Sequence, residues 1–136
     1  MLAEENGFTV AEMLVAISTL GILVAAAAVG LGTLAPQFDL DNGARKVAMA
    51  LNQGRVQAIT RGHTIVVTFD TNDFTITDGE ETVATDRLPS HITISATSAV
   101  TFTPLGTVTV PVTVTVSNSS HSRGVSVGLI GEVQTQ

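Results

Sequence analysis

A single carboxylate, Glu12, stands at the start of the longest apolar segment of the chain. No charged residue follows it from Met13 to Phe38, a stretch of 26 positions. A carboxylate costs roughly 2.5 to 3.5 kcal/mol at the centre of a membrane helix and less near its end. We therefore expect Glu12 to have a partner, and the chemistry it offers is ion pairing rather than catalysis.

The residue types that usually carry catalysis or metal binding are present but scattered. His63, His91 and His121 are well separated, and none has a second ligand at the spacing of a zinc site. The acidic residues between positions 70 and 78 lack the DxDxDG pattern and distal glutamate of a calcium loop. Serine and threonine occur in no nucleophile motif, and there is no phosphate-binding loop. The sequence predicts no enzyme, no cofactor and no metal site.

Four of the six basic residues lie within a short stretch: Arg45, Lys46, Arg55 and Arg61. A solvated helix face is the plainest interpretation of this group. The alternative is a contact with a neighbouring subunit or with an anionic ligand. Nucleic acid is disfavoured, because the net charge is −6 and no aromatic side chain stands beside these arginines for base stacking.

The segment after Glu12 is predicted to be a membrane-spanning helix. As a helix, 26 residues extend about 39 Å, against roughly 30 Å of bilayer hydrocarbon. The segment is apolar on every face, whereas a surface helix of a soluble domain has one apolar stripe. A secretory signal peptide would begin with basic residues and have a shorter apolar stretch, but this chain begins MLAEENG. A plain single-pass anchor stays open, although it leaves Glu12 unexplained.

A second helical stretch is predicted after the apolar run. Gly30, Gly32 and Pro36 predict a kink or loosened turn between the two, because glycine and proline weaken a helix interior. Asp39 or Asp41 can then cap the second stretch. Its apolar positions recur at helical spacing and predict a face that packs on the head: Leu40, Ala44, Val47, Ala48, Leu51, Ala58 and Ile59.

Beyond Gly62, which is predicted to stop the helix, polar and apolar residues alternate in short stretches. The residues Asp70 to Asp73 and Asp78-Gly79 are typical of hairpin loops. Pro111 lacks a backbone N–H group and predicts an edge strand or a break. The predicted strands are Thr64 to Phe69, Phe74 to Thr77, Thr82 to Ala84, Ile92 to Ser95, Val100 to Phe102, Thr107 to Val110, Val112 to Val116 and Gly124 to Leu129.

These elements predict an α+β protein in which a long N-terminal helix packs on a small antiparallel β-sheet head of one or two sheets. With 136 residues, the chain has room for one small head, and the absence of cysteine excludes disulfides and thiolate metal sites. We expect a leader at 1–7, a membrane-spanning assembly helix at 8–38, an amphipathic helix at 39–61 that continues into the head, and a β-rich head at 62–136.

The residues GFTVAEMLVAISTLGILVAAAA resemble the N-terminal signature of type IV pilins. Gly7, Phe8 and Glu12 match its glycine before the cleavage point, its aromatic residue and its glutamate, and Thr9 completes the match. The resemblance implies that a prepilin peptidase cuts between Gly7 and Phe8 and methylates the new amino terminus. The Phe8 amine would then pair with Glu12 of a neighbouring subunit and set the axial register of adjacent helices. Leaders of this family usually carry basic residues, which this one lacks.

Three further segments, LNQGRVQAITRGHTIVVTF, VTFTPLGTV and RGVSVGLIGEV, resemble the GspH/FimT group of minor pilins and pseudopilins. The resemblance implies a structural subunit that initiates or caps a filament in a type II secretion system or a type IV pilus. Its partners would be other pilins, prepilin peptidase and the bacterial inner membrane, crossed once, with the head in the periplasm or in an extracellular filament. A DNA-binding minor pilin for DNA uptake and a plain membrane-anchored binding domain stay open as alternatives.

Overall fold

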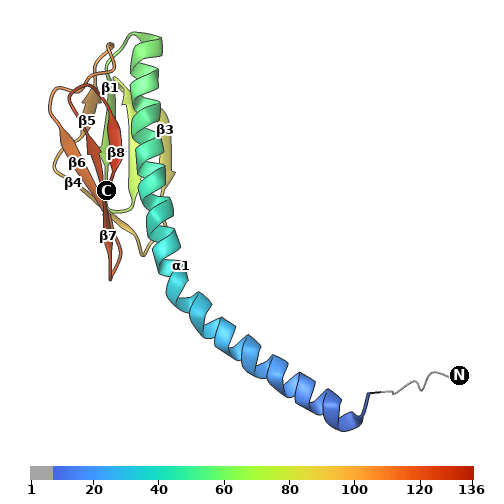
Figure 1. Cartoon of the computed structure of the whole chain (residues 1–136). Coiled ribbons are helices and arrows are strands. Elements are labelled where there is room, and N and C mark those ends of the chain that lie inside the picture. Colours follow the sequence, from blue (N-terminus) through green and yellow to red (C-terminus); the bar gives the residue numbers. More distant parts are fainter. Residues whose placement is uncertain (1–7) are drawn as a thin grey trace, which may run out of the picture. The chain divides into compact units, whose positions relative to one another are not determined.

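The computed structural model describes residues 8–136, with the side chains of 29–34 left out. The predicted leader and Gly7 lie outside the described residues. One long helix, α1, spans Val10–Arg61, and eight strands follow it (Figure 1). The strands are β1 Ile65–Phe69, β2 Asp73–Asp78, β3 Glu81–Arg87, β4 Thr93–Ala96, β5 Val100–Phe102, β6 Val112–Ser117, β7 Ser122–Val127 and β8 Val133–Thr135. The predicted α+β fold is confirmed.

The chain divides into two compact units between Ala35 and Pro36, and the first consists of the N-terminal part of α1. The segment Val10–Ala28 has a mean hydropathy of 2.1, and none of it is buried within the protein. It is long and apolar enough to cross a membrane. This segment therefore has no partner in its own chain among the described residues, whereas α1 packs on the strands from Leu40 onward.

Helix α1 continues through Pro36 without interruption, so neither Asp39 nor Asp41 caps a helix. That prediction was wrong, because α1 continues through both positions, and the two carboxylates instead bind side chains from the β-rich part of the chain. Asp39 lies 3.1 Å from the His91 ring, and Asp41 accepts a hydrogen bond of 2.9 Å from Arg123. Long-range contacts of this kind override a local capping signal.

The second unit, Pro36–Gln136, has its core between α1 and the sheets. The predicted apolar face of the helix is largely confirmed, since Leu40, Ala44, Val47, Leu51 and Ala58 are buried and Ala48 is half-buried. Ile59 was placed in this face wrongly, because its side chain is 52% exposed. Its side chain lies against Gly106, in the loop after β5, rather than against a strand.

Two glycines and one alanine complete the buried helix face, and hydrophobic spacing does not reveal them: Gly43, Ala50 and Gly54. A β-carbon on Gly54 would lie 2.9 Å from Cγ2 of Val67 in β1 and 3.5 Å from the Phe102 ring in β5. Glycine at this position therefore lets the helix backbone approach the sheet more closely than any other residue would allow.

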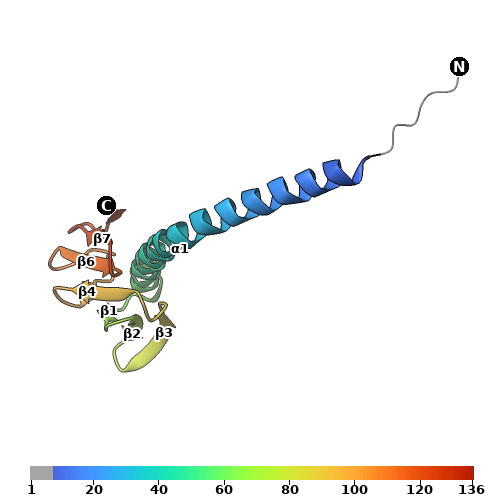
Figure 2. The ribbon, with the colours of Figure 1, turned by 90° about the horizontal axis from the view of Figure 1, so that it is seen from below.

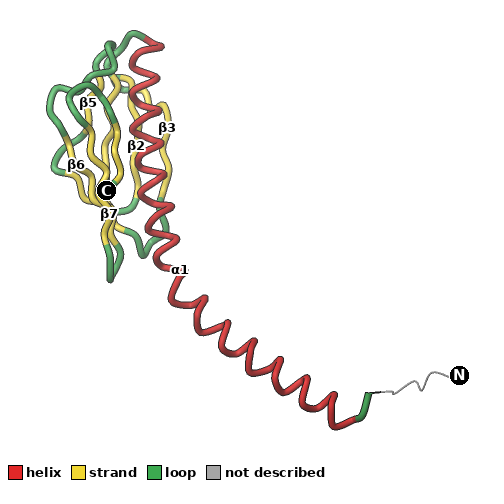
Figure 3. Tube along the Cα trace, in the orientation of Figure 1, coloured by secondary structure: helices red, strands yellow, loops and turns green. Residues whose placement is uncertain are grey.

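The head contains two antiparallel four-stranded sheets, of order β3-β2-β1-β5 and β4-β6-β7-β8. Viewed along the helix, their strands form a curved wall around the second half of α1 (Figure 2). The turns and loops connect strands at the two ends of this wall (Figure 3). The hairpins predicted at Asp70 to Asp73 and at Asp78-Gly79 are confirmed. In β6 the alternation also holds, since Val112, Val114 and Val116 are buried while Thr113 is exposed.

Two strand predictions were wrong. Thr107 to Val110 is not a strand, because it forms only an isolated bridge between Val108 and Phe102 and is followed by Pro111. β6 begins directly after this proline, as the predicted break requires. The final strand β8 was missed, since it is short and contains one apolar residue, Val133, which is only half-buried.

Candidate functional site

The start of α1 brings Thr9 and Glu12 together. The backbone N–H and the hydroxyl of Thr9 both donate to Oε2 of Glu12, at 2.9 and 2.8 Å. In return, the Glu12 N–H donates to the Thr9 hydroxyl at 3.3 Å. This reciprocal arrangement is a capping box, in which the two side chains satisfy backbone donors at the helix start. The T-x-x-E spacing in the sequence was a readable signal for it.

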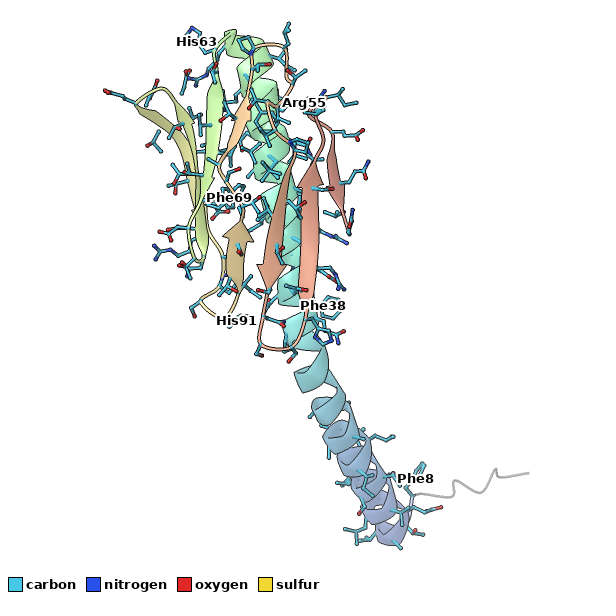
Figure 4. All side chains as sticks on the ribbon, turned by 90° about the vertical axis from the view of Figure 1, so that its left-hand side faces the viewer. Phe8, Phe38, Arg55, His63, Phe69 and His91 are labelled. Carbon is cyan, nitrogen blue, oxygen red and sulfur yellow. The ribbon has the colours of Figure 1, made fainter. Side chains whose placement is uncertain are left out.

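Phe8 lies beside this capping box, and its side chain is 84% exposed (Figure 4). Phe8 and Glu12 border one open hollow on the helix, together with Ala11, Val15 and Ala16. Its lining is almost entirely apolar, apart from the carboxylate. The second Glu12 oxygen accepts no hydrogen bond from any residue in the described part of the chain.

The predicted basic group does not form one site, because the four side chains have different partners. Arg55 is half-buried and donates from Nε to the Gly106 carbonyl at 3.0 Å and from Nη2 to the Ile130 carbonyl at 3.1 Å. Gly106 and Gly131 both have positive φ, 74° and 76°, and a β-carbon on Gly131 would collide with the Gly106 carbonyl oxygen. Through these hydrogen bonds, Arg55 (Figure 4) connects the turns that contain Gly106 and Gly131 to α1.

Lys46 and Arg61 form surface ion pairs with the β2–β3 hairpin. Lys46 lies 2.9 Å from Asp86, and Arg61 lies 3.1 Å from Asp78 and 4.0 Å from Glu81. The hydrogen bond from Lys46 and a second from the Arg87 backbone N–H hold the pKa of the Asp86 carboxyl below its ordinary value. Both pairs are partly solvated, so each contributes at most about 1 kcal/mol.

Arg45 differs from the other three. It is exposed, and it forms no ion pair or side-chain hydrogen bond with any residue that the structure describes. It borders an open hollow between α1 and the C-terminal strand. Among the four basic residues, Arg45 is thus the one without a side-chain partner in the described part of the chain, and the contact role predicted for the group stays a prediction.

The histidines pair separately with acidic residues. His63 lies 3.4 Å from Asp78 at one end of the head, and His91 lies 3.1 Å from Asp39 at the other (Figure 4). Within residues 8–136, no three His, Asp or Glu side chains lie close enough together to hold a metal ion. These pairs connect loops to neighbouring elements.

Comparison with known proteins agrees with this architecture. The fold is similar to that of the type IV minor pilin FimU of Pseudomonas aeruginosa, with a TM-score of 0.64 and 16% identity over 74% of this chain and 90% of FimU. It is also similar to the minor pseudopilin EpsH from the type 2 secretion system of Vibrio cholerae, with a TM-score of 0.60 and 14% identity over 72% of this chain and 96% of EpsH. No curated protein matches the sequence significantly.

The family model for the type II transport protein GspH matches residues 43–131, which is most of the head. These relatives are structural pilin subunits and not enzymes, as the sequence predicted. In such a chain, one apolar N-terminal helix indicates a single-pass, membrane-anchored subunit that assembles with other pilins. Since the matched region exceeds half of its length, this chain belongs to the GspH family of type II transport proteins.

Proposed function

We propose that this chain is a minor pilin or pseudopilin that initiates or caps a filament of a type II secretion system or a type IV pilus. The observation that carries the proposal is the N-terminal unit, in which a capping box with a carboxylate begins a helix that its own chain leaves uncovered. Lipid covers such a helix in the membrane, and helices of neighbouring pilins cover it in a filament.

Processing prepares this unit for assembly. Prepilin peptidase removes residues 1–7 by cutting between Gly7 and Phe8, and methylates the Phe8 amine. The new amine is a cation one helical turn from Glu12, with both residues bordering the same hollow. In the filament, the amine of one subunit pairs with Glu12 of the next, which offsets the cost of burying either charge alone. The assembly helix then comprises residues 8–38, and 39–61 anchors the head to it.

The capping box has a role before assembly. Two hydrogen bonds from Thr9 satisfy one oxygen of the Glu12 carboxylate while the subunit waits in the inner membrane, with its head in the periplasm. A neighbour's amine then binds the remaining oxygen. Thr9 therefore lowers the free-energy cost of placing the Glu12 carboxylate in the membrane. During assembly, Glu12 then sets the axial register of this helix against that of the neighbouring subunit.

Binding of DNA is not favoured by the basic residues. Lys46, Arg55 and Arg61 are occupied by acidic groups or backbone carbonyls of their own chain. The net charge of −6 adds a repulsive field toward phosphates.

Substitution of Glu12 tests the proposal. Glu12→Gln and Glu12→Ala should reach the membrane at normal levels but enter filaments at least about tenfold less, since an interaction worth 1.4 kcal/mol or more is lost. Ser18→Ala is the matched control, because Ser18 only donates to the Leu14 carbonyl within α1. The measurement is the amount of this subunit in sheared filaments relative to membranes. Normal incorporation of both Glu12 variants would refute the register role.

Mass spectrometry of the mature N-terminus tests processing separately. Cells with active prepilin peptidase should yield a chain that begins at methylated Phe8. A mature chain that still begins at Met1 would contradict cleavage after Gly7.

A further inference from the structure

The basic side chains of the head are almost all used within the chain. Five of the six Lys and Arg residues have an acidic or carbonyl partner within 3.3 Å, whereas Arg45 has none among the described residues. The five engaged residues are Lys46, Arg55, Arg61, Arg87 and Arg123. In a chain with twice as many acidic as basic residues, an exposed guanidinium without a partner is unusual.

Asp41, the acidic residue one helical turn before Arg45, is engaged by a different arginine. Asp41 precedes Arg45 by four residues on α1, the spacing and order that favour a side-chain pair on a helix. Instead, the Asp41 carboxylate accepts a hydrogen bond of 2.9 Å from Nε of Arg123 in β7. Arg45 forms no ion pair with Asp41 and is exposed.

The surroundings of Arg45 form a small, open recognition site. A hollow of about 290 Å³ between α1 and β8 is bordered by Arg45, Arg123, Asp41, Ala44, Thr135 and Gln136. It brings the guanidinium groups of Arg45 and Arg123 next to the Asp41 carboxylate, on a chain of net charge −6. An incoming negative group is therefore favoured here and disfavoured over most of the remaining surface.

Strand β8 supplies backbone groups to the same hollow. β8 pairs only with β7 and forms the edge of its sheet. Gly124 and Gln136 exchange two backbone hydrogen bonds, of 3.2 and 2.8 Å. In an antiparallel ladder, the next residue, Thr135, consequently directs its own N–H and C=O away from β7. The N–H group of Thr135, a residue that also borders the hollow, is therefore not used within the sheet.

We infer that this hollow, the Arg45 site, receives a carboxylate side chain from a neighbouring pilin-type subunit. The inference rests on the proposed function, which supplies the neighbour. A free anion would gain only one or two water-exposed bonds, whereas a carboxylate carried on an assembled neighbour is present at high effective concentration. The Asp41 carboxylate in the hollow also repels incoming anions. This repulsion is stronger for a phosphate dianion or a polyanion than for one incoming carboxylate. The site therefore fits an aspartate or glutamate of another subunit.

A zero-length cross-link tests the inference in the full chain. Arg45→Lys retains the charge and adds an amine that a carbodiimide can join to a carboxylate in direct contact. Lys46 and Asp86, 2.9 Å apart, provide an internal positive control in the same molecule. In assembled filaments, mass spectrometry should find an amide between position 45 and an Asp or Glu of another pilin-type subunit. Cross-links from position 45 only to carboxylates of this chain, or none beside a positive control, would overturn the inference.

Charge reversal provides a second readout. Arg45→Glu should lower incorporation into filaments by about tenfold, and Arg45→Gln by less, because only the former adds repulsion. Arg87→Glu is the control, since Arg87 is exposed in β3 and has its own partner in Asp73. If Glu12 variants fail to assemble while Arg45→Glu incorporates normally, the Arg45 site is refuted and the proposed function stands. If Glu12 variants assemble normally, the proposed function itself fails.

Discussion

Arg55 shows how a residue that looks like a surface cation can be structural. Its guanidinium is half-buried and bridges two carbonyls, of Gly106 and Ile130, that belong to different loops. Arginine suits this position because its several N–H donors lie in one rigid plane. Both turns also depend on glycines in the left-handed region. The end of the head is therefore held by one side chain from α1 and by glycines at two turns.

Replacing Arg55 should destabilise the head. We expect Arg55→Gln to lower the free energy of unfolding by about 2 kcal/mol, since a hydrogen bond from a charged group contributes about 1.5 to 3 kcal/mol and this side chain is partly solvated. Arg87→Gln, which breaks only a surface pair with Asp73, should cost less than about 0.5 kcal/mol. Urea unfolding of the full chain in detergent measures both. Equal effects of the two variants would contradict a structural role for Arg55.

At the scale of elements, the head is built by wrapping two sheets around half of one helix. Close packing at Gly54 brings α1 against β1, while ion pairs at the rim attach the edge strands. Lys46 of α1 binds Asp86 of β3, the outermost strand of one sheet. Asp41 of α1 binds Arg123 of β7, next to the outermost strand of the other. Apolar packing therefore stabilises the contact between α1 and the centre of the head, and ion pairs help to position the edges of the two sheets.

The Lys46–Asp86 pair should make a small part of the stability depend on pH. Because the pKa of Asp86 is lowered in the folded chain, the unfolded chain binds this proton more readily. The contribution is present above about pH 4 and is lost as the pH falls through the folded pKa. Relative to Asp86→Asn, the wild type should therefore lose up to about 1 kcal/mol of unfolding free energy on acidification to pH 2. Urea unfolding at several pH values measures this, and a difference that does not change with pH would contradict it.

At the scale of the whole molecule, the two units bury apolar surface by different means. The head has its own core, with 21 buried hydrophobic residues contributed by α1, both sheets and the loops between strands. The segment Val10–Ala28 has no such core and needs lipid or other helices around it. A subunit built in this way can leave the membrane without unfolding, because only the surroundings of its N-terminal helix change.

A charge in the middle of this segment should prevent membrane insertion. Leu20 is near the centre of Val10–Ala28, and its side chain is 61% exposed. Leu20→Arg should lower the membrane-inserted fraction strongly, because an arginine at a helix centre costs roughly 2.5 to 3.5 kcal/mol, or about 100-fold. Leu20→Ala controls for the loss of the side chain. Resistance of the protein to alkaline carbonate extraction measures insertion, and equal resistance of both variants would contradict a spanning role.

Local patterns in the sequence were enough for much of this description. The apolar run after Glu12, the helical stripe from Leu40 to Ala58, the helix end at Gly62 and the alternation in β6 follow from spacing alone, since each depends on residues close in the chain. The T-x-x-E capping box was equally readable. The motif that predicts cleavage after Gly7 lies outside the described residues and stays a prediction.

Only the tertiary structure assigned partners to the polar side chains. Sequence spacing placed Arg45, Lys46, Arg55 and Arg61 in one group and suggested Asp39 or Asp41 as a helix cap. In the structure, distant residues of the head bind three of the four basic residues, each at a different place. Distant residues also bind both aspartates. Packing also left Ile59 exposed and placed Gly54 against Val67 and Phe102. The sequence by itself determined the helix, the turns and the strand faces, because these depend on neighbours in the chain. Which charges remain free to meet another subunit depends on contacts up to 82 residues apart, and those exist only in the folded head.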